Sequence, residues 1–274
     1  MNDSVMRNMA TETWLPQKLF RSSVKMWFSV AAAGHWIFLA YILAVFYPPV
    51  IEHGLEGLKG SHLPSGFVKG DTLGNLASVG HVLLAAIIIG GGPLQLIPGV
   101  RNRFPTFHRW LGRSYLVAAV SSAIAGLYMT WTRSPLGDVI TQIGISGDGV
   151  LIIVFAAFAV HHAMGRRFKA HRQWALRLFL VASAVWFYRV GLMGWAMLTG
   201  GIGVEWETLT GPYIYFLTFA QYLLPLAMLE WYFYCERQST PSMLIAFSTT
   251  LFTLTALMAF GIFAATMGLW LPGM

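Results

Sequence analysis

Charged residues are scarce in this sequence of 274 residues. Asp, Glu, Lys and Arg together make up 11% of the chain, whereas hydrophobic residues make up 56%. Soluble domains carry about 25% charged residues, so this chain has too few charges to cover a surface that faces water. The composition excludes an ordinary soluble domain and predicts an all-α, polytopic integral membrane protein.

Cysteine and recognisable catalytic motifs are also missing. Cys235 is the single cysteine, which excludes an intrachain disulfide and a cysteine-based metal site. The chain has no nucleophile elbow, no P-loop and no dinucleotide-binding glycine pattern. No predicted span pairs His, Asp or Glu at helical spacing, so a hydrolytic zinc site has little support. The sequence therefore assigns neither a catalytic residue nor an enzymatic activity.

Long apolar runs are what the sequence does have. A helix that crosses a membrane needs about 20 mainly apolar residues, and the apolar runs predict seven such spans in a single bundle over residues 26–274. The predicted spans are 26–47, 73–97, 110–132, 148–165, 174–198, 212–234 and 241–270. The last of these is long enough to be tilted, or interrupted near Gly261.

The positions of the basic residues predict an orientation. With residues 1–25 in the cytoplasm, 14 of the 18 Lys and Arg residues lie in inner segments and three in outer loops, as the positive-inside rule requires. We expect a multi-pass protein of the bacterial inner membrane whose cytoplasmic face contacts anionic lipid head groups. The net charge of +7 does not indicate nucleic-acid binding, because the charges lie in short loops. Residues 17–28, after Pro16, are either an interfacial amphipathic helix or a frayed basic tail.

Two similar basic motifs begin two of the outward-going spans. F-H-R-W-L-G-R occupies residues 107–113, and A-H-R-Q-W-A-L-R occupies residues 170–177. Anchoring at the membrane interface explains their Arg and Trp residues, but it does not require a His in both. Their cofactor-binding candidates are His108, Arg109, His171 and Arg172.

Two histidines lie inside predicted spans among small residues. His35 lies near the centre of the first span, and His81 lies in the outer half of the second. An ionisable group within the membrane is costly and is a functional hypothesis by default. Two such histidines on neighbouring helices can ligate the iron of a b-type haem. The alternative is that both are hydrogen-bonded packing residues.

Arg189 lies near mid-depth of the fifth predicted span and needs an anion or several carbonyls there. Asp148, at the predicted outer start of span 148–165, is the expected protein partner. A haem propionate or the acidic group of another ligand would serve equally. Both an Arg189–Asp148 lock and a ligand site remain open.

Four histidines lie near the inner rim: His108, His161, His162 and His171. They suit a second haem, a quinone site whose carbonyls bond to His and Arg, or an interface with no ligand. The run Gly90-Gly91-Gly92-Pro93 predicts an interruption of the second span, because Pro removes a helical hydrogen bond and Gly relaxes the backbone. The interruption is either a kink or the wall of a site.

Several of these segments, in this order, resemble one known family. They are G-H-V-L-L-A-A, G-G-G-P-L-Q-L-I-P, F-H-R-W-L-G-R-S-Y, A-G-L-Y, A-H-R-Q-W-A-L-R and Y-R-V. Together they resemble the bacterial membrane-protein family catalogued as domain of unknown function 2306, over roughly residues 74–195. The resemblance implies a membrane fold and a set of matching positions but no reaction. His35 lies outside the matched part, so His81 with His108 or His171 is a rival pairing.

Three functions follow as hypotheses. The first is a membrane electron-transfer protein that binds haem b, quinone or both through His81, His35, His108, His171, Arg109, Arg172 and Arg189, with a membrane redox partner. The second is a binding or transport protein for a small lipid-soluble or anionic molecule. The third is a structural subunit of a larger membrane complex.

Overall fold

The computed structural model describes residues 3–60, 66–133, 137–238 and 240–274, with side chains from Trp14 onward. Helices dominate these residues, and the one β-type contact among them is an isolated bridge between Glu205 and Thr210. The all-α prediction is confirmed. The elements are α1 (Asp3–Val45), α2 (Tyr47–His53), η1 (Gly54–Leu58), α3 (Thr72–Leu96), α4 (Pro98–Arg103), α5 (Pro105–Thr132), α6 (Val139–Met164), α7 (Phe168–Ala182), α8 (Ala184–Thr199), α9 (Pro212–Arg237), α10 (Pro241–Ala265), η2 (Thr266–Trp270) and α11 (Leu271–Gly273).

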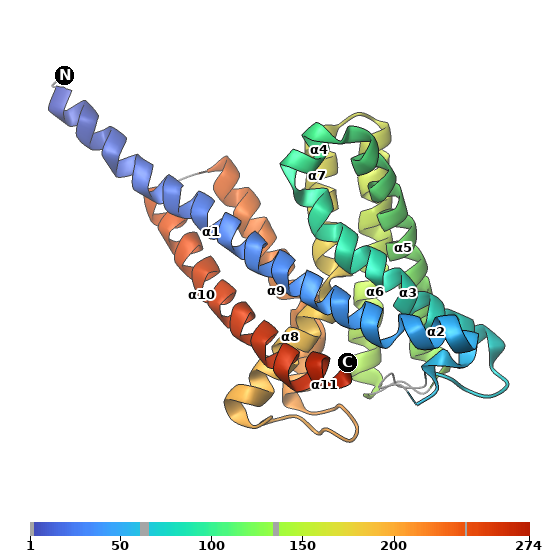
Figure 1. Ribbon diagram of the computed structural model, residues 1–274. Coiled ribbons are helices and arrows are strands. Elements are labelled where there is room, and N and C mark those ends of the chain that lie inside the picture. The colour runs from blue at the N-terminus through green and yellow to red at the C-terminus, as the bar shows by residue number, and fades with distance from the viewer. Residues whose placement is uncertain (1–2, 61–65, 134–136, 239) are drawn as a thin grey trace.

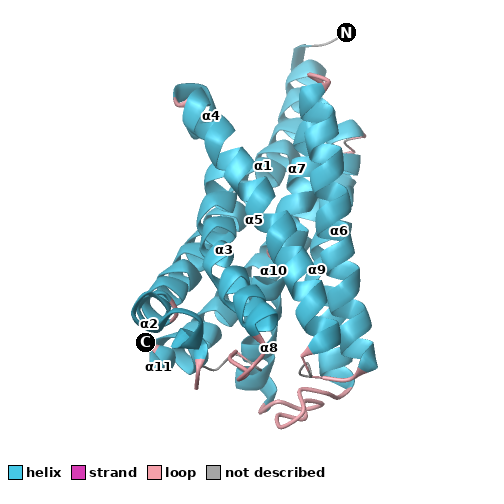
Figure 2. Ribbon diagram, turned by 90° about the vertical axis from the view of Figure 1, so that its right-hand side faces the viewer, coloured by secondary structure: helices cyan, strands magenta, loops and turns pink. Residues whose placement is uncertain are grey.

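The long helices form a bundle whose connections lie at its two ends (Figures 1 and 2). On one side α1 packs along α10, and α10 also packs on α8; on the other side α3, α5, α6 and α7 pack in sequence order. Contacts of α1 with α3, and of α9 with α6 and α7, join the two sides. We call the end that carries α4 and the α6–α7 connection the basic end, because Arg101, Arg103, Arg166 and Arg167 lie there.

Polar side chains fix where several helices begin. The Asp71 carboxylate accepts a hydrogen bond from the Gly74 amide at 2.9 Å, at the start of α3. The Asp138 carboxylate accepts from two amides at the start of α6, and the Thr240 hydroxyl accepts from one at the start of α10. Such caps satisfy backbone donors that a helix leaves free in its first turn.

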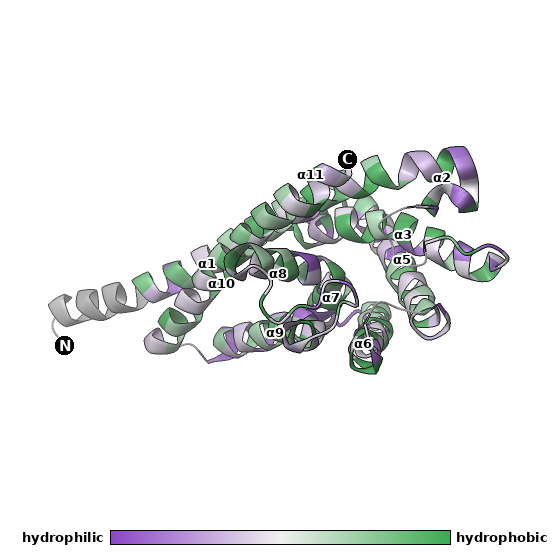
Figure 3. Ribbon diagram, turned by 90° about the horizontal axis from the view of Figure 1, so that it is seen from below, coloured by the Kyte–Doolittle hydropathy of each residue, from purple (hydrophilic) through white to green (hydrophobic). Residues whose placement is uncertain are grey.

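Six helices in the described residues are long and apolar enough to cross a membrane, and the count rises to seven if the bent pair α7–α8 is one span. Apolar side chains face outward along these helices, including Val117, Ile124, Val150 and Leu257, which are 51–65% exposed. Figure 3 shows hydrophobic segments around the helical bundle. Lipid would cover such a surface, and the prediction of a multi-span membrane protein is confirmed.

The predicted interruption at Gly90–Pro93 is wrong, because α3 runs through it without a break. The three glycines instead admit neighbouring helices at close range. A β-carbon at Gly90 would lie 2.9 Å from Leu39 of α1, and one at Gly92 would lie 3.0 Å from Phe179 of α7. Small residues let membrane helices approach closely, so this run is a packing surface where several helices meet.

The break falls in the fifth predicted span instead. Helices α7 and α8 meet at Ser183 with a bend of 47°. The Ser183 hydroxyl donates to the Phe179 carbonyl at 2.8 Å, a back-bond that often bends helices. Nothing in the local sequence resembles a Gly or Pro break, so the prediction of one straight span over 174–198 missed it.

Both chain ends also differ from expectation. Residues 17–28 are not a separate helix: α1 is continuous from Asp3 to Val45, with Pro16 inside it. At the other end, α10 passes Gly261 uninterrupted, and the irregularity is a π-helical turn at Thr266–Trp270. Gly261 marks a helix crossing, since a β-carbon there would lie 2.6 Å from the Val190 carbonyl oxygen.

Candidate functional site

Three ionisable side chains lie at similar depth in the half of the bundle away from the basic end. At 1.5 Å per residue, His81 is about 14 Å from the start of α3, Asp148 about 14 Å from the start of α6, and Arg189 about 15 Å from the end of α8. The sequence predicted Asp148 at the start of its span. That placement is wrong, because α6 begins nine residues earlier, at Val139.

Arg189 has no acidic partner among the described residues, so the expected Arg189–Asp148 lock is absent. Its guanidinium lies over the Phe38 ring, 5.3 Å from the ring centroid. One nitrogen makes a long hydrogen bond of 3.4 Å to the Val185 carbonyl oxygen. Its electrostatic neighbours are the hydroxyls of Tyr41 and Tyr188. A guanidinium has five donors, so most of its hydrogen-bonding capacity is unused.

His81 lies close enough to Arg189 to feel its charge. Its Nδ1–H donates to the Ser122 carbonyl oxygen of α5 at 2.9 Å, because a carbonyl can only accept. This bond fixes the neutral tautomer with the lone pair on Nε2. Nε2 has no hydrogen-bond partner among the described residues, and the side chain is half-buried. His81 therefore offers an acceptor beside the unused donors of Arg189.

His35 is engaged at both nitrogens. Nδ1–H donates to the Ala31 carbonyl oxygen at 2.7 Å, and Nε2 lies 3.0 Å from the Ser183 hydroxyl at the α7–α8 bend, whose single proton Nε2 and the Phe179 carbonyl oxygen share. The ring lies 5.5 Å from the Phe179 ring and 4.2 Å from the Trp186 ring, between centroids. Ligation of iron through Nε2 of His35 would require the contact with Ser183 to break, whereas the bond to Ala31 could remain. Here His35 ties the bend to α1.

The second basic motif binds α7 to α9. Arg172 forms an ion pair with Glu236 at 3.4 Å and donates to the Tyr232 hydroxyl at 3.0 Å. Arg177 bonds to both carboxylate oxygens of Glu230, at 2.7 and 2.9 Å. The anion that Arg172 was expected to find in a ligand is thus supplied by the protein.

The first basic motif stays on the surface. Arg109 is exposed, with a 3.3 Å hydrogen bond to the Thr106 hydroxyl, and Arg113 lies over the Trp110 ring at 5.0 Å from the centroid. Exposed aromatic and basic residues of this kind are typical of the membrane interface. The two motifs are alike in sequence, but one lies at the protein surface and the other joins two helices.

The histidines of the basic end come from three helices. His171 of α7 donates from Nδ1 to the Ala159 carbonyl oxygen at 2.9 Å, and His108 of α5 and His162 of α6 each lie within electrostatic reach of it. In the part of the chain that the structure describes, no three His, Cys, Asp or Glu side chains converge as metal ligands. The arrangement brings these histidines near one another without forming a metal site.

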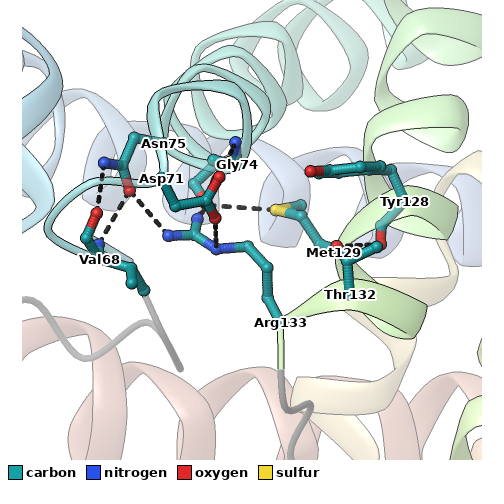
Figure 4. A network of polar contacts seen from close by, with 9 residues as sticks. Val68, Asp71, Gly74, Asn75, Tyr128, Met129, Thr132 and Arg133 are labelled. Atoms are coloured by element: carbon teal, nitrogen blue, oxygen red, sulfur yellow. Dashed lines mark hydrogen bonds and ion pairs between the residues drawn. The ribbon is translucent and has the colours of Figure 1, made fainter.

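Arg133 was not among the predicted site residues, yet it lies in a network of polar contacts (Figure 4). It donates to the Gly74 carbonyl at 2.7 Å, the Ser78 hydroxyl at 2.6 Å and the Asn75 side chain at 2.7 Å, and it lies 3.1 Å from the Asp71 carboxylate. Its side chain is 3% exposed. This network joins the end of α5 to the start of α3. The pattern D-x-x-x-N-x-x-S at residues 71–78 was the available signal.

The comparisons with known proteins agree with the membrane fold. Residues 78–210 match the family model described as "Predicted membrane protein (DUF2306)", close to the range that the motifs predicted. No curated protein and no solved structure matches the chain. The matched region spans α3 to α8 and carries His81, His108, His171 and Arg189. Over residues 78–210 the chain therefore matches the DUF2306 family of predicted membrane proteins, the family that the sequence motifs resemble.

Proposed function

We propose that the chain binds a small lipid-soluble molecule with oxygen acceptors inside the membrane, between Arg189 and His81. The observation that carries this proposal is the guanidinium of Arg189, which has no carboxylate partner among the described residues. An unpaired charge within a membrane is costly and typically belongs to a binding site or an ion path.

The chemistry of the two side chains favours a quinone. Arg189 can donate to a carbonyl oxygen, and Nε2 of His81 can accept from the hydroxyl of the reduced quinol. The Phe38 ring beneath the guanidinium and the nearby Tyr41 offer flat surfaces for an aromatic head group. Both the quinone and the reduced quinol would therefore have a hydrogen-bond partner in this site.

Haem b is the second candidate, and the orientation of His81 favours it. Histidines that ligate metals usually donate their other ring nitrogen to a carbonyl or carboxylate, as His81 does toward Ser122. Arg189 would then hold a propionate. The second axial ligand is the weak point, because Nε2 of His35 is already in contact with the Ser183 hydroxyl. Electron transfer through the membrane would follow from either cofactor.

The location and the orientation of the protein are also part of this proposal. We propose that the basic end faces the cytoplasm of a bacterial inner membrane, where Arg109 and Arg113 contact anionic head groups. A membrane redox partner is part of the electron-transfer proposal.

The test begins with an absorption spectrum of the purified full chain, oxidised and then reduced with dithionite. A Soret band that shifts on reduction identifies haem. In its absence, decylubiquinone is titrated against the chain in nanodiscs, and binding is followed by tryptophan fluorescence. A charge-assisted hydrogen bond contributes about 1.5–3 kcal/mol, so we expect Arg189→Gln to weaken binding about 10- to 150-fold. His81→Ala should weaken it by a smaller factor.

The matched control is Arg113→Gln, which removes an exposed arginine that lies over Trp110. It should bind as tightly as the wild-type chain. A chain with neither a haem spectrum nor saturable quinone binding would refute the proposal. So would unchanged affinity in both Arg189→Gln and His81→Ala, and the structural-subunit hypothesis would then be favoured.

A further inference from the structure

Asp148 is a carboxyl group inside the membrane-spanning part of the bundle. It lies on α6 and is 8% exposed. Its Oδ1 atom is buried and has no hydrogen-bond partner in the described structure. No Lys, Arg or His nitrogen among the described residues forms an ion pair with it. The group thus lacks both the cation and the donors that a buried carboxylate requires.

Helix α9 covers this part of α6 through close contacts. Thr218 packs directly on Gly144, one turn before Asp148. A β-carbon at Gly147 would lie 3.0 Å from the Tyr222 hydroxyl. The Thr218 hydroxyl is itself buried without a partner, and its side chain is fully buried. The glycines of α6 therefore allow α9 to seal the carboxyl group from solvent.

The remaining neighbours supply no countercharge. Helices α5, α7 and α9 pack on α6, and Tyr222 of α9 interacts electrostatically with Asp148. On the α5 side, the close contact of this segment is apolar, between Gly149 and Leu127. A phenol is neutral near pH 7, so it cannot balance a carboxylate.

A proton is the ligand that this geometry accommodates. Burying an ionised carboxylate in a medium of low polarity costs far more than burying the neutral acid. A metal ion or a water molecule would need space beside Oδ1, whereas a proton adds almost no volume. We propose that Asp148 is a proton-binding site within the membrane, neutral when α9 packs on α6, and able to release its proton when that contact opens.

This inference goes beyond the proposed ligand site and stands without it, because it depends on α6 and α9 rather than on Arg189. Asp148 lies at about the same depth as His81 and Arg189, counted at 1.5 Å per residue. A proton site at that depth suits a molecule whose binding or turnover moves protons.

Infrared spectroscopy of the full chain in nanodiscs tests the proposal. A protonated carboxyl group has a C=O stretching band that a carboxylate lacks. Exposed Asp and Glu side chains are ionised at pH 7, so a band at that pH reports a buried acid. We expect a band in the wild-type chain, its loss in Asp148→Asn, and a shifted band in Asp148→Glu. Glu207→Gln, in the exposed loop before α9, should leave it unchanged.

Two results would overturn the proposal: no protonated-carboxyl band in the wild-type chain at pH 7, or the same band in the wild type and Asp148→Asn. If Asp148→Asn does not fold, the Asp148→Glu spectrum decides the assignment, because a band from another residue would not shift.

Discussion

At the Arg133 network, where α3 meets α5, the contribution of charge to the free energy of unfolding can be separated from that of helix capping. Asp71 has two roles there. Its carboxylate forms the ion pair with Arg133 at 3.1 Å and also caps α3 by accepting from the Gly74 amide at 2.9 Å. Asn caps helices about as well as Asp. Asp71→Asn therefore removes the charge while it retains a capping oxygen.

The magnitude follows from burial. Removing one partner of a buried ion pair costs about 3–5 kcal/mol, because the other charge is left uncompensated. The Arg133 side chain is 3% exposed, but that of Asp71 is 32% exposed, and Arg133 keeps three other hydrogen bonds. A loss of about 2 kcal/mol, between that of an exposed and that of a buried ion pair, is therefore expected for Asp71→Asn. Asp71→Ala also loses the cap and should cost about 1 kcal/mol more.

The assay is reversible unfolding of the full chain in mixed micelles with increasing SDS, followed by circular dichroism. Glu207→Gln removes an exposed acidic residue and should unfold as the wild type does. If Asp71→Asn unfolds within about 0.5 kcal/mol of the wild type, a range typical of surface substitutions, the Asp71 charge does not stabilise this junction. Equal losses in Asp71→Asn and Asp71→Ala would show that the cap contributes nothing.

Three further predictions use the same assay. Gly261→Ala should cost about 1–3 kcal/mol, because its β-carbon would lie 2.6 Å from a backbone oxygen of α8; wild-type stability would contradict that crossing. His35→Ala should cost about 3 kcal/mol through two lost hydrogen bonds and a cavity, whereas exposed His53→Ala should be neutral; similar losses in both would contradict the role of His35. The hydrogen bond from Tyr215 holds the pKa of the Asp138 carboxyl below its usual value. The contribution of the Asp138–Tyr215 hydrogen bond to the stability of the folded chain is therefore complete above the unfolded pKa of about 4, and it is lost as the pH falls through the folded pKa. Tyr215→Phe should reduce this loss of stability in acid, and an unchanged dependence of stability on pH would argue against the bond.

The sequence alone settled the class of protein and most of its spans. Apolar runs of about 20 residues require a membrane, and no tertiary contact is needed to recognise them. The predicted boundary of a span was wrong where polar residues lie within the helix near its end. Residues 139–147 include Thr141 and Ser146, so the sequence pattern began the fourth span too late. In the structure Thr141 lies beside Asp138, and Ser146 accepts from the Trp131 indole at 3.0 Å.

Only the tertiary structure decided what the individual polar residues do. The motifs at residues 107–113 and 170–177 look alike, yet Arg172 and Arg177 pair with Glu236 and Glu230 on α9, whereas Arg109 has no acidic partner among the residues that the structure describes. The same holds for His35, which has a polar contact at each ring nitrogen, and for Arg189, which has no carboxylate partner within the described ranges. Local sequence sets whether a segment is helical and apolar. The partner of a buried charge is set by which helices pack together, and that depends on contacts between residues far apart in the chain.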